Sequence, residues 1–319
     1  MLSDPTGAVV VKPCTQAEIS FYESIAESHP DLAPHLPTFM GTLSLSGDKA
    51  PVSEGPESGT ITTADGKVER LHGKKLETEL HIVLENITHG FKRPNVLDLK
   101  LGAQLWDDAA KPEKRARLDA VSAETTSGSL GFRIAGMRTW RGVPAPEIPA
   151  DLKEYAKSED GYWVYNKMYG RKFSASDVEE GFKSYVLPTG AEKSQQELER
   201  AREILAFSLG EVKDIIAAFE KKESRMYSAS ILIVYEGDVD EYAKTKQTLR
   251  SAAPDTEEGG EDEDLPQLAA VKMIDFAHAT FRKGEGPDEN ALKGMRSTST
   301  ILKNLLDTTE KELDAAEGD

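Results

Sequence analysis

The spacing of apolar residues divides the chain into a strand-rich front and a more helical back. Short or alternating apolar runs predict strands at residues 9–12, 38–45, 81–84, 228–235 and 271–276. Apolar residues at helical spacing predict helices over 16–28, 111–122 and 191–222, and within 286–307. No repeat of fixed period occurs, so this order of elements indicates an α+β protein.

The chain has 319 residues, and 39 Lys and Arg against 56 Asp and Glu give a formal net charge of −17. No apolar stretch approaches the roughly 18 residues that a membrane helix needs, so we expect no membrane span. Residues 1–11 lack the pattern of a signal peptide, and the single cysteine, Cys14, favours a reducing compartment. The acidic total argues against direct nucleic-acid binding and, taken alone, against a strongly anionic substrate.

The charge is unevenly distributed along the chain. Residues 255–264 carry seven acidic side chains and no basic one, which predicts a disordered acidic loop over 251–266, either a solvated insertion or a partner-binding segment. Residues 88–141 instead hold ten Lys and Arg against six Asp and Glu, a local charge of +4 (10 − 6). The total charge therefore does not exclude an anionic substrate.

Two acidic positions stand out, while glycine-rich phosphate loops, protein-kinase signatures, the GxSxG elbow and the HExxH zinc motif are absent. Asp98 and Lys100 share one side of a predicted strand at 94–102, which suits phosphoryl transfer, although a salt-bridged edge strand is an open alternative. Asp275 ends the apolar strand at 271–276, where a hard carboxylate suits Mg²⁺ that bridges ATP phosphates.

These segments occur in a specific order. PxxxDxKxG at 94–102, the strand at 228–237 and Ile-Asp-Phe-Ala-His at 274–278 together resemble the inositol polyphosphate kinase family, whose SSLL strand here has Ala229 in place of a serine. The resemblance covers nearly the whole chain. It is greatest to the fungal multikinases, because the segment before Gly131 is short and residues 103–106 lack the Thr-Arg-Gln-His-Gly run of hexakisphosphate kinases.

The resemblance implies a two-lobed, protein-kinase-like fold with ATP between the lobes. Residues 1–87 would form the N-terminal lobe, and a strand that relatives have ahead of Lys12 is expected to be missing. Residues 88–319 would form the C-terminal lobe, with a short helical segment at 103–135 that binds inositol phosphate. The implied activity is transfer of the γ-phosphoryl group of ATP to the 6- and 3-hydroxyls of inositol 1,4,5-trisphosphate, towards tetrakis- and pentakisphosphate.

The resemblance also assigns residues to ATP. Lys12 matches a lysine that contacts the ATP phosphates, and Glu85 and Ile87 match the hinge that meets the adenine. Asp98 matches an aspartate at the ATP ribose and near the reacting hydroxyl, two roles that the sequence does not separate. Asp275 matches the Mg²⁺ ligand, so the implied metal is Mg²⁺.

Cations are assigned to the inositol phosphate. Lys100 matches a lysine that meets both substrate and transferring phosphoryl group, and Lys114 and Arg133 match substrate contacts. Arg117 lies three residues after Lys114, so both share one helix face, and Arg171 is a further candidate. For Arg117 and Arg171 a solvated surface position is an equal alternative.

Other readings stay open at this level. One is a scaffold for transcription-factor complexes that keeps the kinase fold, and another is a trisphosphate 3-kinase or hexakisphosphate kinase. The resemblance further suggests phosphatidylinositol bisphosphate as a second acceptor, transcription factors as partners, and a location in nucleus and cytoplasm.

Overall fold

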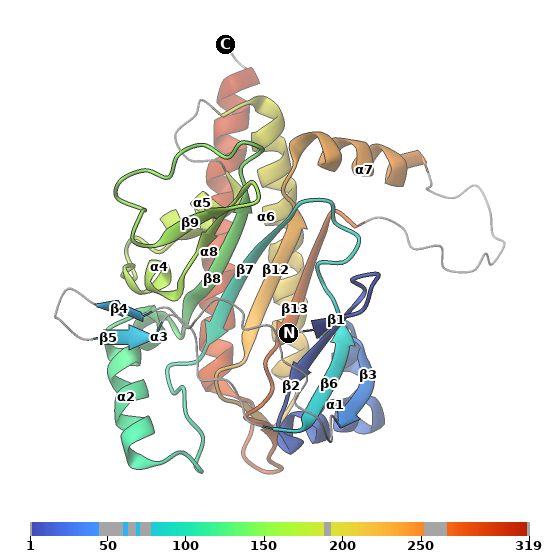
Figure 1. Ribbon diagram of the computed structural model, residues 1–319, viewed down its shortest axis with the longest axis vertical. Helices are drawn as coiled ribbons and strands as arrows, with labels where there is room; N and C mark the ends of the chain where they lie inside the picture. The colour runs from blue at the N-terminus through green and yellow to red at the C-terminus, as the bar shows by residue number, and fades with distance from the viewer. Residues whose placement is uncertain are drawn as a thin grey trace.

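Two antiparallel sheets organise the chain in the computed structural model, which describes residues 2–44, 60–62, 68–70, 78–187, 193–251 and 267–317. The smaller sheet has the order β1 (Leu2–Ser3), β2 (Val9–Pro13), β6 (Leu80–Glu85), β3 (Phe39–Ser44). The larger has the order β13 (Ala269–Ile274), β12 (Ser230–Glu236), β7 (Pro94–Leu101), β8 (Phe132–Trp140), β10 (Tyr162–Tyr165), β9 (Ala156–Glu159). Figure 1 shows the smaller sheet at the lower right, beside the larger one, and residues 86–93 connect β6 to β7.

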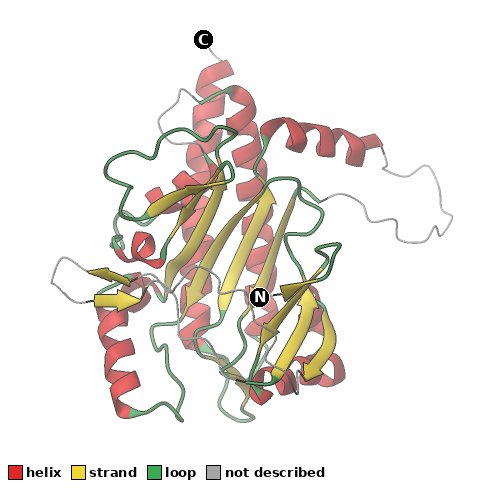
Figure 2. Ribbon diagram, viewed as in Figure 1, coloured by secondary structure: helices red, strands yellow, loops and turns green. Residues whose placement is uncertain are grey.

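The helices lie mainly behind and around these sheets. α6 (Gln195–Phe219) and α8 (Glu289–Glu317) run side by side across one face of the large sheet, as Figure 2 shows. The small sheet is accompanied by α1 (Gln16–Ser28) and η1 (Pro30–His35). The remaining helices are α2 (Pro112–Ala123), α3 (Thr126–Leu130), α4 (Lys167–Arg171), α5 (Glu179–Val186) and α7 (Val239–Ser251). Two short two-stranded sheets are also present: β4 (Thr60–Thr62) pairs with β5 (Val68–Arg70), and β11 (Ser224–Met226) pairs with β14 (Ala279–Phe281).

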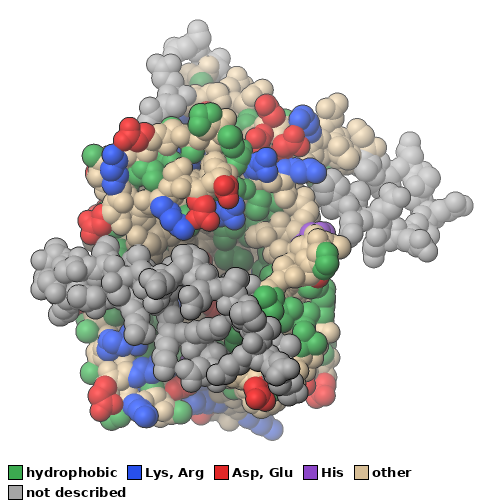
Figure 3. Space-filling model, in the orientation of Figure 1, with side chains coloured by type: hydrophobic (Ala, Val, Ile, Leu, Met, Phe, Trp, Pro, Cys, Tyr) green, Lys and Arg blue, Asp and Glu red, His purple; other side chains and the backbone are tan. Residues whose placement is uncertain are grey.

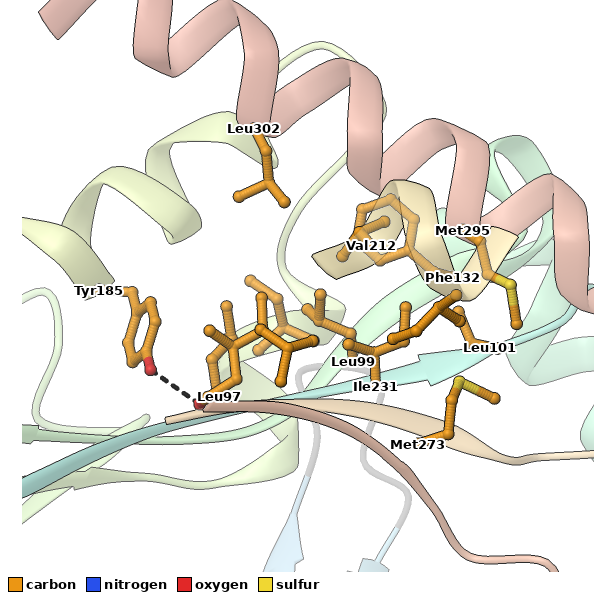
Figure 4. Close-up of a cluster of buried hydrophobic side chains, with 14 of the residues drawn as sticks. Leu97, Leu99, Leu101, Phe132, Tyr185, Val212, Ile231, Met273, Met295 and Leu302 are labelled. Carbon is orange, nitrogen blue, oxygen red and sulfur yellow. Dashed lines mark hydrogen bonds between the residues drawn. The ribbon is translucent and has the colours of Figure 1, made fainter. Parts of the chain in front are cut away.

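The alternation along β7 separates the core from the functional face. Leu97, Leu99 and Leu101 have no exposed surface and point toward α8, where they meet Phe132 and Met295 (Figure 4). Burial of apolar side chains is the main source of folding free energy, at about 25 cal/mol per Å² of apolar surface. The intervening side chains of β7 lie on the opposite face of the sheet. One strand thus contributes both to the core and to the cleft described below.

Most predicted elements are present, with differences at their ends. Ser194 caps α6 through a reciprocal pair of hydrogen bonds with Glu197, which explains why the helix begins later than residue 191. α8 extends to residue 317, ten residues further than predicted (317 − 307), since Leu313 continues its buried face. α7 was not predicted, because Tyr242 is its one buried residue and its pattern is otherwise polar.

Two further expectations concern the strand ahead of Lys12 and the acidic loop. A strand ahead of Lys12 was expected to be missing, but Leu2–Ser3 pairs with Val10 and Val11, so a short strand is present. The acidic loop predicted at 251–266 lies outside the described residues except for Ser251, the last residue of α7. Within the described residues, no helix is both long and apolar enough to cross a bilayer. Figure 3 shows basic and acidic side chains interspersed on the upper part of one face, so no single acidic surface forms there.

Candidate active site

A cavity of about 500 Å³ lies between the two sheets. Its walls come from β2 and β6 of the small sheet, from the connection after Glu85, and from β7, β8, β12 and β13 of the large sheet. Apolar side chains form much of the wall, among them Val10, Leu84, Val96 and Leu232. A largely apolar cavity of this size with a few charged groups is typical of a small-molecule site.

Lys12 reaches this cavity from β2 and is held by two carboxylates. Its Nζ atom lies 2.9 Å from Oε1 of Glu18 and 3.1 Å from Oδ1 of Asp275. Burial lowers the pKa of Lys12, but the two carboxylates outweigh this effect and raise it above its ordinary value. Lys12 is therefore a fixed cation at neutral pH.

Glu18 is a site residue that sequence reasoning missed. It lies in the first turn of α1, where its backbone N–H donates to the Thr15 side chain, and its side chain is buried. A buried glutamate is rarely left unpaired. The available signal was its place beside Ile19 at the start of an amphipathic helix whose apolar face continues with Tyr22.

Asp275 follows β13 with a φ of 66°, in the left-handed region that non-glycine residues seldom adopt. Phe276, directly after it, is fully buried and stacks on Phe21 at 4.5 Å, which anchors this bend. The Asp275 carboxylate lies 3.7 Å from Nζ of Lys100 as well as near Lys12. Burial raises the pKa of Asp275, yet Lys100 and Lys12 outweigh it and lower the pKa below its usual value.

Asp98 and Lys100 project from β7 into the same region, as the alternation predicts. Lys100 Nζ donates to the Ser228 carbonyl at 2.8 Å and to Ser230 Oγ at 3.3 Å. Oδ1 of Asp98 is buried and has no hydrogen-bond partner among the described residues. Burial raises the pKa of Asp98, Lys100 opposes this effect, and the nearby Asp275 adds to it. A salt-bridged edge strand does not describe this arrangement, because β7 is an interior strand.

The donor set fits a hard divalent cation. Asp98 offers an unpartnered carboxylate oxygen, and the Asp275 carboxylate is 43 % exposed. Within the described part of the chain, no group of three or more His, Cys, Asp or Glu gathers to hold a metal. A cation here would therefore take its other oxygen ligands from phosphate and water, as Mg²⁺ commonly does.

Glu85 and Ile87 both line the cavity at the connection between the sheets. One carboxylate oxygen of Glu85 accepts hydrogen bonds from Thr38 N at 3.0 Å and Thr38 Oγ1 at 2.9 Å. Ile87 is buried in a small apolar cluster with Phe91 and Val234. The structure thus ties this connection to both sheets at the cavity wall.

The structure brings Arg133 and Arg171 close to the β7 groups. Arg133 lies on β8 directly opposite Lys100 in the strand register, and its Nη1 donates to Ser127 Oγ at 2.9 Å. The pKa of Arg133 is lowered to about 10, because burial and the charge of Arg171 both lower it and together outweigh the opposing charge of Asp98. Arginine side chains this close repel one another, so an anion between them would relieve the repulsion.

Lys114 and Arg117 are placed differently. Both are exposed on α2 and, among the described residues, make no hydrogen bond or ion pair. α2 is anchored instead by Arg115, which donates to Ala110 O at 2.8 Å and lies 4.6 Å above the Trp106 ring. Figure 1 shows α2 at the lower left, apart from β13. These two cations do not join the cluster around Asp275.

His278 and Asp107 form a further pair near the site that sequence reasoning missed. His278 Nδ1 lies 2.6 Å from Oδ2 of Asp107, three residues beyond Asp275. The start of the same segment is fixed by Asn290, in the first turn of α8. Its Oδ1 atom accepts from the backbone N–H groups of Ala103 and Gln104 at 2.9 and 2.8 Å. Through the Asp107–His278 contact, the predicted substrate-binding segment at 103–135 is thus attached to the loop that carries Asp275.

A model of the inositol polyphosphate kinase family matches residues 81–303, more than half of the chain. The chain belongs to this family. The resemblance stated from its motifs and the prediction of a phosphotransferase are therefore confirmed, and a scaffold without catalysis is not favoured. The matched range includes Asp98, Lys100 and Asp275, and it leaves Lys12 and Glu18 outside.

Individual relatives agree with this assignment. The inositol polyphosphate multikinase of Saccharomyces cerevisiae is 28% identical, over 94% of both chains. That of Schizosaccharomyces pombe is 29% identical, over 93% of this chain and 91% of the relative. The inositol hexakisphosphate kinase 3 of Mus musculus is 30% identical over 92% of this chain and 68% of its own.

A solved structure confirms the predicted α+β fold. The inositol phosphate multikinase of S. cerevisiae in complex with ADP and Mn²⁺ is 30% identical, with a TM-score of 0.68, and the match covers 94% of this chain and all of that one. The family and its fold are thus established from sequence and structure together.

Proposed function

We propose that this protein is an inositol polyphosphate multikinase that uses Mg²⁺ and ATP to phosphorylate inositol 1,4,5-trisphosphate at its 6- and 3-hydroxyls. The observation that carries the proposal is the cluster of Lys12, Asp98, Lys100 and Asp275 at one cavity between two sheets. The two fungal relatives bear the name multikinase, which favours this subfamily. The yeast relative binds ADP and Mn²⁺, which supports a nucleotide and a divalent metal.

The geometry suggests how the chain itself would act on ATP. The cavity wall at Glu85 and Ile87 would receive the adenine, and Lys12 would turn from Asp275 to a phosphate oxygen when the nucleotide enters. Asp275, with Asp98 beside it, would hold the metal, which neutralises phosphate charge when bound. Lys100 would then follow the transferring group, because its ammonium already lies within 4 Å of Asp275.

The acceptor would lie on the Arg133 side of the cleft. Lys100 and Arg133 lie near Asp98, and Arg171 lies near Arg133, so these cations suit a ring that carries several phosphates. Asp98 would accept the hydrogen bond of the reacting hydroxyl or of the ribose. Catalysis would then rest on positioning and charge neutralisation. Lys114 and Arg117 would add an outer contact from α2 to the same substrate.

One incubation tests the reaction and its order. The protein is mixed with Mg·ATP and inositol 1,4,5-trisphosphate, and the product isomers are resolved by chromatography. We expect tetrakis- and then pentakisphosphate. In Asp275→Asn we expect kcat to fall by about 10³-fold or more with an unchanged circular dichroism spectrum, since the variant lacks the metal-holding charge. The exposed Asp314→Asn serves as the matched control; a normal rate in Asp275→Asn would refute the assignment.

A second measurement separates substrate contacts from nucleotide contacts. Lys114→Ala should raise KM for inositol trisphosphate several-fold and leave KM for ATP unchanged, because its side chain lies outside the ATP cavity. Lys244→Ala, on the exposed face of α7, is the control. Equal changes in both KM values would contradict the role given to Lys114.

Three further points are proposals from family membership alone. They are phosphatidylinositol bisphosphate as a second acceptor, transcription-factor partners, and a distribution between nucleus and cytoplasm. A vesicle kinase assay, affinity purification from nuclei and imaging of a fluorescent fusion test them in turn. Absence of lipid product, of nuclear partners or of nuclear signal would each refute the corresponding point.

A further inference from the structure

A second cavity, of about 680 Å³, lies at the end of the large sheet where β7 begins and β12 ends. Asn95 and Tyr235 contribute to its wall from these two strands. Both share the strand face of the buried core residues Leu97 and Ile233, whereas Asp98 faces the catalytic cleft. The second cavity and the catalytic cleft therefore open on opposite faces of the same sheet.

A buried arginine with an unsatisfied donor forms part of this wall. Arg200, on α6, is only 5% exposed, and its Nη1 donates to the Gly237 carbonyl at 2.5 Å. Its Nε is buried and has no hydrogen-bond partner in the part of the chain that the structure describes. Among the residues that the structure describes, Arg200 makes no ion pair with a carboxylate. A buried charge without a counter-charge is costly to the folded state.

Arg141 adds a second guanidinium to the same wall. Its Nε donates to Thr139 Oγ1 at 3.1 Å, and its Nη2 donates to the Ser184 carbonyl at 3.3 Å and the Tyr165 hydroxyl at 3.4 Å. Its guanidinium lies 4.5 Å above the Trp163 ring. All of these described partners are neutral, so Arg141 also lacks a counter-charge.

Two of the three carboxylates that line the cavity are engaged in helix capping. Glu197 Oε2 accepts from Ser194 N at 3.0 Å and Ser194 Oγ at 2.9 Å, which caps α6. Asp238 Oδ1 accepts from the N–H groups of Asp240 and Glu241 at 3.0 and 3.1 Å, at the start of α7. Of the carboxylates that line the cavity, Asp240 is the one that caps neither helix.

Aromatic rings complete the site. The Trp163 and Tyr235 side chains line the cavity, whereas the Trp140 ring, which packs against Tyr162, projects to the opposite face of the sheet. The Arg200 guanidinium lies 5.6 Å from the Tyr235 ring, and the Arg141 guanidinium lies 4.5 Å from the Trp163 ring, so each arginine of the wall has an aromatic ring beside it. Flat rings beside arginines favour a ligand with a planar body and an anionic group.

We propose that this cavity binds a small organic oxyanion, a phosphate monoester or a carboxylate on a planar ring, independently of the catalytic cleft. The Arg200 and Arg141 guanidinium groups would hold the oxyanion, and the Trp163 ring would contact the planar body. The volume is within the range of ligand-sized sites.

The test uses the three tryptophans of the chain as separate reporters. The full-length protein is labelled with 5-fluorotryptophan, its three ¹⁹F resonances are assigned by Trp→Phe variants, and phenyl phosphate or benzoate is added. The Trp163 ring lines the second cavity, the Trp140 ring lies on the opposite face of the sheet, and Trp106 lies beside α2. We expect a saturable shift of the Trp163 resonance with Trp106 unchanged. The tighter of the two probes identifies the oxyanion as phosphate or carboxylate.

Variants connect this shift to the arginines. Arg200→Met should raise Kd at least about tenfold, as loss of a charge-assisted contact predicts, while Arg202→Met on the same helix should not. Gln196→Phe fills the exposed edge of the cavity without removing a buried group, and it should abolish the shift even if Arg200→Met fails to fold. No saturable shift in the wild type, a shift of Trp106 alone, or full binding in Gln196→Phe would overturn the proposal.

Discussion

Neutralising Glu18 tests how the cleft holds its lysine. In Glu18→Gln the side chain keeps its shape and loses its charge, so Lys12 retains one carboxylate partner, Asp275, at 3.1 Å. The lysine should then stay closer to Asp275. The incoming nucleotide must break the Lys12–Asp275 pair before Asp275 can act, so we expect a lower kcat/KM for ATP.

The size of the effect follows from the geometry. At 2.9 Å the Lys12–Glu18 attraction is about 6 kcal/mol for an effective dielectric constant near 20. Desolvation of the buried carboxylate cancels much of this, and the glutamine amide still accepts a hydrogen bond. A net loss of about 1.5–2.7 kcal/mol predicts that kcat/KM for ATP falls by about 10- to 100-fold.

Steady-state kinetics with varied ATP measures this change, and thermal denaturation checks folding. Glu23→Gln, exposed on the same helix, is the matched control. A double-mutant cycle with Lys12→Met should show strong non-additivity, because Lys12→Met removes the lysine through which Glu18→Gln acts. Additive effects, or a Glu18→Gln rate within twofold of the control, would refute the coupling.

Two further predictions concern stability. Burial raises the pKa of Asp98, so at neutral pH its ionised form destabilises the folded state. Asp98→Asn should therefore raise Tm at pH 7 by about 2 °C and abolish activity. The gain in Tm should vanish below the ordinary carboxyl pKa of about 4, where Asp98 is protonated in both the folded and the unfolded state. An equal gain at pH 3 would contradict this assignment. Gly294→Ala should cost about 2 kcal/mol or more in urea denaturation, since its Cβ would lie 2.1 Å from the Gly131 carbonyl oxygen, whereas Gly210→Ala meets nothing within 4 Å and should be neutral or stabilising. Equal stability of the two variants would refute the steric argument.

The local sequence pattern was sufficient to predict which side chains of a single strand or helix are buried. The alternation in β7 placed three leucines in the core and Asp98 with Lys100 on the opposite face, because side chains of a strand alternate whatever it pairs with. Helical spacing likewise identified α1, α2, α6 and α8. It did not reveal α7, whose polar sequence has no buried stripe.

The sequence by itself determined the family, the main elements and the identities of Lys12, Asp98, Lys100 and Asp275. Only the tertiary structure decided which of these meet: Lys12 and Asp275 are 263 residues apart, and Glu18 joins them from a helix that no motif marks. It also placed Arg133 opposite Lys100 and left Lys114 exposed on α2, and it buried the Arg200 Nε atom without a hydrogen-bond partner among the described residues. Periodicity reports the environment of one element, whereas contacts between distant residues depend on how the sheets and helices pack together.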